Sequence, residues 1–432
     1  MLVAKFGGTS VRDAHAMQQV ASILSSRVAE HGSVIAVASA TSGTTNTLLA
    51  LAAHRDAEAE RDCRLRHHAI IDEAISVTSE AHARVDELFD ELATYLDALA
   101  ILGECTDESR DTVVSFGERL STTILHAVCV HNGINTALVD ARTLIRTDAS
   151  YGSAGVDMPT TRTQCASLRT TDVQLIITQG FIGATADHRT TTLGRGGSDY
   201  TAAILGWACD ATAIEIWTDV SGIYTCDPRV IPAATPIPTL GFQHVRELAL
   251  YGAKVVHPET IMPAVSAAIP VRILNTFAPT EPGTTIVPDP TPSDAHIVAV
   301  SMLRDCRHVL ASSTVLARMR AAGGLDGAVV VGADAIDSGA LVVRCTTMEH
   351  AQAFTALCEA HDLHATPCGV LAVCSTGEWT SDQIARVMQQ LDGCHVRTVT
   401  SGATHTSLLV VLDECDVVHG AERIHAEITR RR

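Results

Sequence analysis

Thr191-Thr192-Leu193-Gly194-Arg195-Gly196-Gly197-Ser198-Asp199-Tyr200 is the most informative stretch of this chain. Its three glycines allow positive φ and let ligand atoms approach the main chain closely. Hydroxyls, one arginine and one aspartate surround them and supply donors and charge for holding an anion. The run from Tyr200 to Cys209 is typical of a helix, so the loop opens onto a helix N-terminus, which favours negative charge. The stretch therefore predicts an anion-binding loop and an acidic substrate.

The chain has 432 residues and a formal net charge of −18 at pH 7. This length exceeds one ordinary core, so two or three domains are expected. The acidic balance argues against nucleic acid or an anionic membrane surface as a partner, although acidity also serves plain solubility. Lys5, Gly7 and Gly8 interrupt the N-terminus before an apolar core can form, so no signal peptide is expected.

Thirteen cysteines are scattered along the chain without any C-x-x-C pair, and their odd number argues against a disulfide framework. Several lie in apolar runs, where a thiol acts as a small core residue. A reducing cytosol fits this usage best, so a cytoplasmic location is predicted. The twenty histidines show no metal-ligand spacing, and no protein-bound metal is expected.

Strand and helix signals alternate over the first two thirds of the chain. The apolar strands predict an α/β fold with a mainly parallel sheet covered on both faces. Ligands bind such sheets at the carboxyl ends of the strands, where the glycine-rich loops lie. Residues 61–100 are expected to be mostly helical, with one apolar face between Leu88 and Leu99. The expected strands are Leu2–Phe6, Val34–Ala38, Ala137–Asp140, Val173–Thr178, Ala211–Trp217 and Ile269–Leu274.

A proline-rich break begins at Ala278 and indicates a linker. Beyond it the rhythm changes to short strand, helix, strand, strand, helix, and this rhythm occurs twice. Two small α+β units of this kind contain no glycine-rich anion loop. They are expected to be binding or regulatory modules.

Lys5-Phe6-Gly7-Gly8 spans the end of the first expected strand and the turn after it, and is the second candidate for an anion site. A lysine at the end of a buried strand is costly unless an anion compensates its charge, and the two glycines let backbone N–H groups face a phosphate. The alternative, an ordinary turn with a solvated lysine, has about equal weight on these residues alone. A Walker A motif is excluded, since Gly-Lys never occurs as a dipeptide.

Three further segments carry polar groups that suit a nucleotide or an acidic co-substrate. Thr218–Arg229 follows a strand and contains Tyr224 for stacking and Arg229 for pairing with phosphate. Lys254 follows small residues, and Glu118 is expected just before a helix at Ser121–His131. Taken singly, each has a structural explanation: a turn, a solvated lysine and a carboxylate at a helix start.

Read together, these segments resemble the aspartokinases of the amino-acid kinase family. The resemblance implies a three-layer amino-acid-kinase-like fold with a mainly parallel sheet over residues 1–287. It rests on KFGGTSV (Lys5–Val11), SATSGTTN (Ser39–Asn46), GERLS (Gly117–Ser121), QGFIG (Gln179–Gly183), TTTLGRGGSDY (Thr190–Tyr200), TDVSGIYTCDPR (Thr218–Arg229) and YGAKVVHP (Tyr251–Pro258).

The resemblance implies ATP-dependent phosphorylation of the β-carboxylate of L-aspartate, the first step towards lysine, methionine and threonine. Lys5 and Lys254 would neutralise charge on the transferring group and Asp199 would orient them, with Mg²⁺ carried by the nucleotide rather than by the protein. The implied substrate-binding residues are Ser39, Thr45, Glu118, Arg195 and Ser198. The implied ATP-binding residues are Lys5, Gly7, Gly8, Thr218, Asp219, Tyr224, Arg229, Lys254 and Val255.

The remainder of the chain resembles the paired ACT modules of aspartokinases, which are small ferredoxin-like α+β units. They would cover residues 288–365 and 366–432 and would join the chain into a homodimer or a higher homo-oligomer. The first module departs from the pattern at Ala321–Leu325, where lysine-sensitive relatives carry a bulkier loop, so inhibition by lysine or threonine is in doubt. A monofunctional enzyme is expected, and the alternatives are a non-catalytic amino-acid sensor and a kinase for another amino acid.

Overall fold

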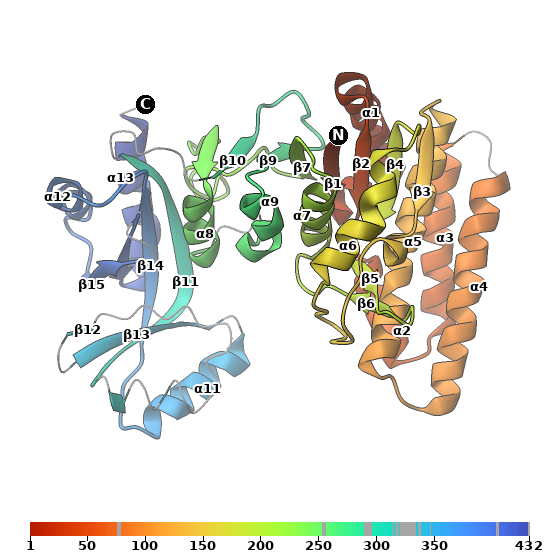
Figure 1. Ribbon diagram of the computed structural model, residues 1–432. Coiled ribbons are helices and arrows are strands. Elements are labelled where there is room, and N and C mark those ends of the chain that lie inside the picture. The colour runs from red at the N-terminus through yellow and green to blue at the C-terminus, as the bar shows by residue number, and fades with distance from the viewer. Residues whose placement is uncertain are drawn as a thin grey trace. The chain divides into compact units, whose positions relative to one another are not determined.

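The computed structural model describes residues 1–75, 79–252, 256–288, 296–312, 314–315, 319, 334–335, 338–345, 347–402 and 406–430. Two compact units emerge, one made of residues 1–222 and 257–288 and the other of residues 223–256 and 289–432 (Figure 1). Lys254, Val255 and the loop Ala321–Leu325 lie outside the described residues. Among the residues that are described, no helix is long and apolar enough to cross a membrane.

The first unit is built on a mainly parallel sheet, as predicted. Its neighbouring strands are parallel up to β9, and β10 then pairs antiparallel with β9. The strands lie in the order β3 (Thr136–Val139), β4 (Leu175–Gln179), β2 (Val34–Ala38), β1 (Leu2–Phe6), β7 (Ala213–Thr218), β9 (Val271–Asn275) and β10 (Thr284–Val287).

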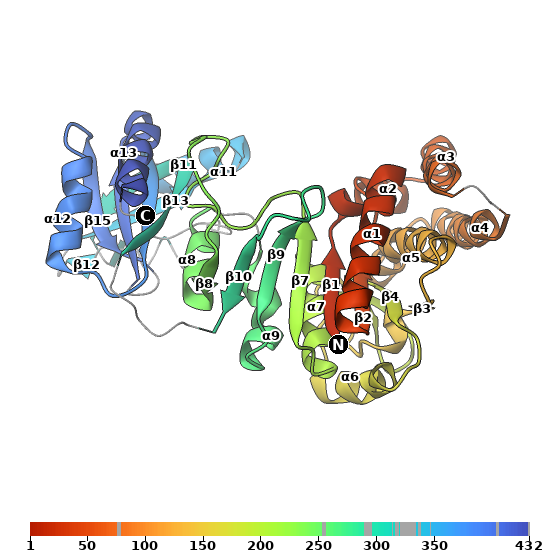
Figure 2. The same ribbon diagram turned by 90° about the horizontal axis from the view of Figure 1, so that it is seen from above.

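Helices cover both faces of this sheet because its central strands are apolar on both sides. All five residues of β2 are buried. Figure 2 shows α1 (Ala14–His31) and α7 (Gly197–Ala208) on opposite faces of β1 and β2. The shorter helical segments of this unit are η1 (Gly8–Val11), α2 (Thr44–Ala53), η2 (Ala141–Thr143), α6 (Met158–Gln164), η3 (Cys165–Arg169), η4 (Pro258–Ile261) and α9 (Met262–Ser266).

Three long helices, α3 (Ala57–Ala74), α4 (Ser79–Leu102) and α5 (Asp107–His131), form a further layer of this unit. The apolar face predicted between Leu88 and Leu99 is buried in the same core as β1 and β2, except for the partly buried Leu88. A short antiparallel hairpin, β5 (Ile182–Ala184) and β6 (Thr190–Thr192), leads into α7.

The second unit contains a six-stranded antiparallel sheet. Its long strand β11 pairs with β14 along most of its length and with β13 over its second half, so strands of both predicted modules share one sheet. The module boundary at residue 366 stays a prediction. The strand order is β12 (Asp334–Ala335), β13 (Ser338–Arg344), β11 (Ile297–Ala311), β14 (Thr366–Ser375), β16 (Ser407–Leu412) and β15 (Val396–Ser401). The remaining elements are β8 (Thr239–Gly241), α8 (Phe242–Leu250), α11 (Met348–Glu359), α12 (Ser381–Gln390), η5 (Glu414–Asp416) and α13 (Val417–Thr429).

Candidate active site

A cavity of about 550 Å³ opens in the first unit, where β1, β2 and the loop before α7 end. Its walls come from the start of η1, the loop after β2, the first turn of α2, the middle of α5 and the glycine-rich loop. The position agrees with the rule that ligands of parallel sheets bind at the carboxyl ends of the strands. Eight of the predicted site residues line it: Lys5, Gly8, Ser39, Thr45, Glu118, Arg195, Ser198 and Asp199.

Lys5 is held in this cavity by an ion pair. It is the second-to-last residue of β1, and its Nζ lies 2.7 Å from Oδ1 of Asp199 on α7. The two side chains are only 12% and 14% exposed. A partly buried lysine requires a compensating charge, which Asp199 supplies, so the ammonium group stays at the cavity wall instead of extending into solvent.

Two helices begin at the cavity wall with their N–H groups uncapped by side chains. The N-cap residues are Gly43 for α2, with φ of 84°, and Gly196 for α7, with φ of 71°. Both conformations favour glycine, and at Gly196 a Cβ would also lie 2.7 Å from Cγ2 of Thr260. Two helix N-termini that no side chain caps make this cavity attractive to anions.

Glu118 lies in the middle of α5 and not before a helix, so the predicted helix start at Ser121 is wrong. Gly117 gave the misleading signal of a break. Its hydrogen side chain instead permits close packing, because a Cβ there would lie 2.8 Å from the Cβ of Ala40. The contact brings α5 against the loop after β2 and carries Glu118 into the cavity.

The Glu118 carboxylate is only 3% exposed and is incompletely paired. Its Oε1 accepts a hydrogen bond from the Ala40 N–H at 3.2 Å, while its Oε2 has no partner. Burial raises the pKa of Glu118 from its usual 4.5 to about 8. An arriving cation would restore the ionised form, which makes Glu118 a receptor for a substrate ammonium group.

Ser39 and Ser198 join the two sides of the cavity. The Ser39 hydroxyl donates to Oγ of Ser198 at 2.9 Å, and the Ser39 carbonyl accepts from Oγ of Ser121 at 2.6 Å. Gly180 packs directly beneath, since a Cβ on it would lie 2.5 Å from Ser198. The hydroxyl pair is therefore fixed by the ends of β2 and β4 and by α5.

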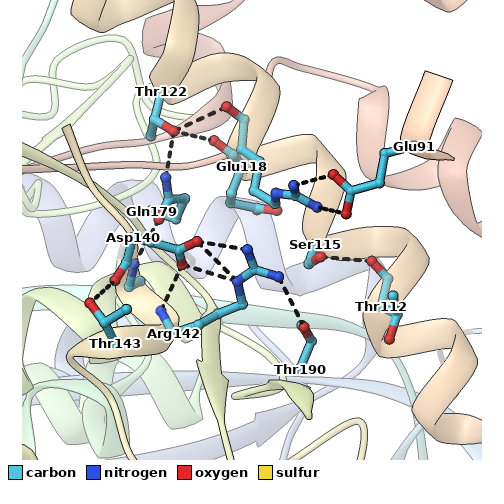
Figure 3. Close-up of polar contacts among 12 residues, drawn as sticks. Glu91, Thr112, Ser115, Glu118, Thr122, Asp140, Arg142, Thr143, Gln179 and Thr190 are labelled. Atoms are coloured by element: carbon cyan, nitrogen blue, oxygen red, sulfur yellow. Dashed lines mark hydrogen bonds and ion pairs between the residues drawn. The ribbon is translucent and has the colours of Figure 1, made fainter. Parts of the chain in front are cut away.

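Behind Glu118 lies a hydrogen-bond network that the sequence did not disclose (Figure 3). Oγ1 of Thr122 donates to the Glu118 carbonyl at 2.7 Å and accepts from Nε2 of Gln179 at 2.9 Å. Oε1 of Gln179 in turn accepts from the Ala141 N–H at 2.8 Å. Gln179 thereby ties α5 to the end of β4. The sequence did mark Gln179 as part of the QGFIG motif, but the motif alone did not predict which groups its side chain bonds.

Arg195 is the exposed cation of the cavity. Its guanidinium makes no hydrogen bond or ion pair among the described residues. A planar fork of donors left free at a cavity wall suits a carboxylate, which it can bind by two parallel hydrogen bonds.

The predicted nucleotide residues are not brought together in the same way. The Gly7 N–H donates to the Trp217 carbonyl at 3.2 Å, so it is already engaged. Gly8 does line the cavity, and a Cβ on it would lie 2.9 Å from the Ala40 carbonyl oxygen. Thr218 and Asp219 follow β7, bond to each other at 3.1 Å and do not line this cavity.

Two other nucleotide candidates, Tyr224 and Arg229, belong to the second unit. There Arg229 pairs with Asp227 at 2.7 Å and is largely exposed. Lys254 and Val255 fall outside the described residues, so the ATP-binding set stays a prediction. Across the part of the chain that is described, no group of three or more His, Cys, Asp and Glu side chains could hold a metal ion.

Comparison with known proteins gives a family and a set of relatives. Residues 1–275 match the model of the amino acid kinase family. The chain is 37% identical over 292 residues to lysine-sensitive aspartokinase 3 of Escherichia coli K12, covering 66% of this chain and 64% of that protein. It is also 37% identical over 300 residues to aspartokinase 1, chloroplastic, of Arabidopsis thaliana, covering 66% of this chain and 51% of that protein. These alignments span less than two thirds of either relative.

Solved structures match over nearly the full chain. E. coli aspartokinase III in complex with lysine and aspartate (T-state) has a TM-score of 0.84 and 30% identity and covers 99% of both chains. The same enzyme in complex with aspartate and ADP (R-state) has a TM-score of 0.79 and 29% identity and covers 99% of this chain and 100% of that chain.

Proposed function

We propose that this chain, which belongs to the amino acid kinase family, is an aspartate kinase. It would transfer the γ-phosphoryl group of ATP to the β-carboxylate of L-aspartate and form 4-phospho-L-aspartate, the first step towards lysine, methionine and threonine. The observation that carries the proposal is the convergence of Lys5, Glu118 and Arg195 in one cavity. The likeness to an aspartokinase that binds aspartate and ADP supports it.

The cavity offers complementary groups for both ends of the amino acid. Glu118, with an unpartnered buried oxygen, would receive the α-ammonium group. Arg195 would clamp the α-carboxylate through its free guanidinium. Ser39, Thr45 and Ser198 would add hydrogen bonds from the surrounding wall.

The chemistry asks for alignment and charge neutralisation more than for proton transfer. A carboxylate is already ionised at neutral pH, so the nucleophile needs no general base. Lys5 would stabilise negative charge on the transferring group, and its ion pair with Asp199 fixes the ammonium position beforehand. Lys254 is the second proposed cation. Mg²⁺ would arrive with ATP, held mainly by its phosphates.

An aspartate-dependent assay tests the proposal. Purified protein with ATP, Mg²⁺ and L-aspartate should release ADP, and hydroxylamine should trap the acyl phosphate as a hydroxamate. ADP release without a hydroxamate would contradict it. A substrate panel of other amino acids tests the alternative kinase, and complete inactivity with retained amino-acid binding would support a non-catalytic sensor.

We also propose a homodimer or higher homo-oligomer formed through the C-terminal modules, in a cytoplasmic setting. All thirteen cysteines are free thiols and ten are buried, which fits a reducing compartment. Light scattering of the full chain tests the assembly. A thermal-shift screen with lysine, threonine and methionine tests for an allosteric effector, because ligand binding raises the melting temperature by mass action.

A further inference from the structure

The three consecutive threonines of β6 are each anchored to a different segment. Oγ1 of Thr190 accepts from Nη1 of Arg142 at 3.3 Å (Figure 3). The Thr191 hydroxyl lies 2.7 Å from the Thr147 hydroxyl. Thr192 is bound to Asp111 of α5. This short strand leads directly into the glycine-rich loop, so its anchors determine where that loop begins.

The Asp111 carboxylate is the tightest of these anchors. It is 2% exposed and accepts three hydrogen bonds. Oδ2 accepts from the Thr192 N–H at 2.8 Å and from the Gly152 N–H at 2.9 Å, and Oδ1 accepts from the Thr192 hydroxyl at 2.8 Å. No ion pair to Asp111 is found among the described residues. Hydrogen bonds from two N–H groups and one hydroxyl therefore compensate for the burial of this carboxylate, and they can do so only while those donors stay in place.

The Gly152 contact extends this clamp to the turn of the glycine-rich loop. The Ala154 N–H donates to the Thr192 carbonyl at 2.9 Å, so segment 152–154 lies alongside β6. Gly194 has a φ of 75°, and a Cβ there would lie 3.1 Å from the Ser153 hydroxyl. The turn that precedes Arg195 is therefore packed against a segment that Asp111 holds.

Asp111 and Glu118 share one face of α5. Their separation of seven residues is close to two helical turns, a rise of about 10 Å. One rigid helix thus carries both the carboxylate proposed for the ammonium group and the clamp on the strand leading to Arg195. Only Leu193 and Gly194 lie between Thr192 and Arg195.

We propose that Asp111 is a positioning residue that fixes Arg195 relative to Glu118 and thereby sets selectivity for an α-amino acid. The inference rests on the proposed function, since it concerns the two groups that would hold the α-ammonium and the α-carboxylate. Asp111 does not line the cavity and touches no substrate. Its effect would pass through β6 and the Gly194 turn.

The variants Asp111→Ala and Asp111→Asn test this role. The alanine variant leaves two N–H groups without an acceptor, and we expect KM for aspartate to rise about tenfold while KM for ATP stays within about twofold. The asparagine oxygen can accept both N–H bonds while its amide donates to Thr192. It should recover aspartate KM to within about threefold of the original.

A second buried carboxylate provides the matched control. Glu215 is 1% exposed and is held by Arg27 and Arg272 at 2.8 and 3.0 Å, away from the cavity lining. Glu215→Gln should lower the melting temperature without changing aspartate KM. Equal rises in both KM values for Asp111→Ala, or an unchanged aspartate KM in the folded variant, would overturn the proposal.

Thr192→Val offers a milder change should Asp111→Ala fail to fold. It removes one hydrogen bond and should raise aspartate KM by about two- to fivefold. If the unaltered protein shows no aspartate-dependent turnover, the proposed function fails by itself. Hydrogen exchange then decides the positioning role: amides 193–197 should exchange faster in Asp111→Ala or, where that variant does not fold, in Thr192→Val, and should stay close to the original in Asp111→Asn. Unchanged exchange in Thr192→Val would refute the role.

Discussion

The substrate side and the nucleotide side of the proposed active site are built in opposite ways. On the substrate side, Lys5, Glu118 and Arg195 line one cavity within one unit. On the nucleotide side, Thr218 and Asp219 belong to the first unit and Tyr224 and Arg229 to the second. The order of the sequence motifs predicted substrate-binding residues and ATP-binding residues alike. The structure brings the predicted residues together in one cavity only on the substrate side, where the strand ends and helix N-termini belong to one core.

The largest effect is expected at Lys5, where the two sides would meet. Lys5→Met keeps the length of the side chain but removes the charge opposite Asp199. Turnover should fall by about 10³, because a preorganised charge at the transferring group is lost. Steady-state ADP release measures this, with Lys5→Arg as the variant that retains charge. Turnover within about twofold of the original would remove Lys5 from the mechanism.

Glu118→Gln should affect the substrate side alone. The amide cannot pair with an ammonium group as a carboxylate does, so KM for aspartate should rise by about 10². KM for ATP should remain unchanged, since Glu118 lines the cavity that we propose for aspartate. Glu60→Gln, which alters a buried carboxylate paired with Arg55, serves as the control. An equal rise in KM for ATP would contradict the assignment of Glu118 to aspartate binding alone.

The pH profile should separate the sides as well. Burial raises the pKa of Glu118 to about 8, so the empty site is mostly protonated at neutral pH. In the proposed site, aspartate binding would require the ionised form of Glu118, and KM for aspartate should therefore fall by about tenfold per pH unit from pH 6 towards 8. ATP KM should show no such slope. In Glu118→Gln the slope should disappear; a slope that persists there would assign it to another group.

A smaller effect is expected on the nucleotide side. Thr218→Val and Asp219→Asn each remove a polar group after β7, and ATP KM should rise by about three- to tenfold. KM for aspartate should stay constant, because neither residue lines the cavity that we propose for aspartate. Isothermal titration with a non-hydrolysable ATP analogue gives the same answer without turnover. Unchanged nucleotide affinity in both variants would withdraw this pair from the ATP site.

The smallest expected effect is on stability. The raised pKa of Glu118 means that the folded protein holds a proton between about pH 4.5 and 8 that the unfolded chain has lost. Stability from this group is complete below that window and is lost as pH rises through it. Glu118→Gln should raise the melting temperature by about 2–5 °C at pH 8 and by less at pH 5. Scanning calorimetry at both values checks the sign.

Much of the fold could be predicted because its signals are local. The apolar strands β1 and β2 begin and end where their sequences indicated. Glu118 was chosen from a motif, but its helix was misjudged, since Gly117 marks close packing against Ala40 and not a helix end. Close packing between segments distant in sequence leaves no periodic signal.

Asp111 and Gln179 could not be assigned from the sequence for a related reason. Each acts by bonding to backbone or hydroxyl groups of segments that only the fold brings near. Nothing in the neighbouring residues distinguishes an aspartate with three buried donors from one on a solvated helix face. Their roles become visible only when α5, β4 and β6 are in place.

The Lys5–Asp199 ion pair has a practical consequence, because Lys5 and Lys254 are the only lysines in the sequence. Acylating reagents directed at amines therefore have few targets on this protein: two side chains and the chain's α-amino group. Peptide mapping by mass spectrometry after brief acylation should report the Lys5 amine separately from Lys254 and the α-amino group. Acylation of Lys5 should be slow while Asp199 is present and faster in Asp199→Asn. The rate of acylation of Lys5 therefore reports whether the ion pair is formed.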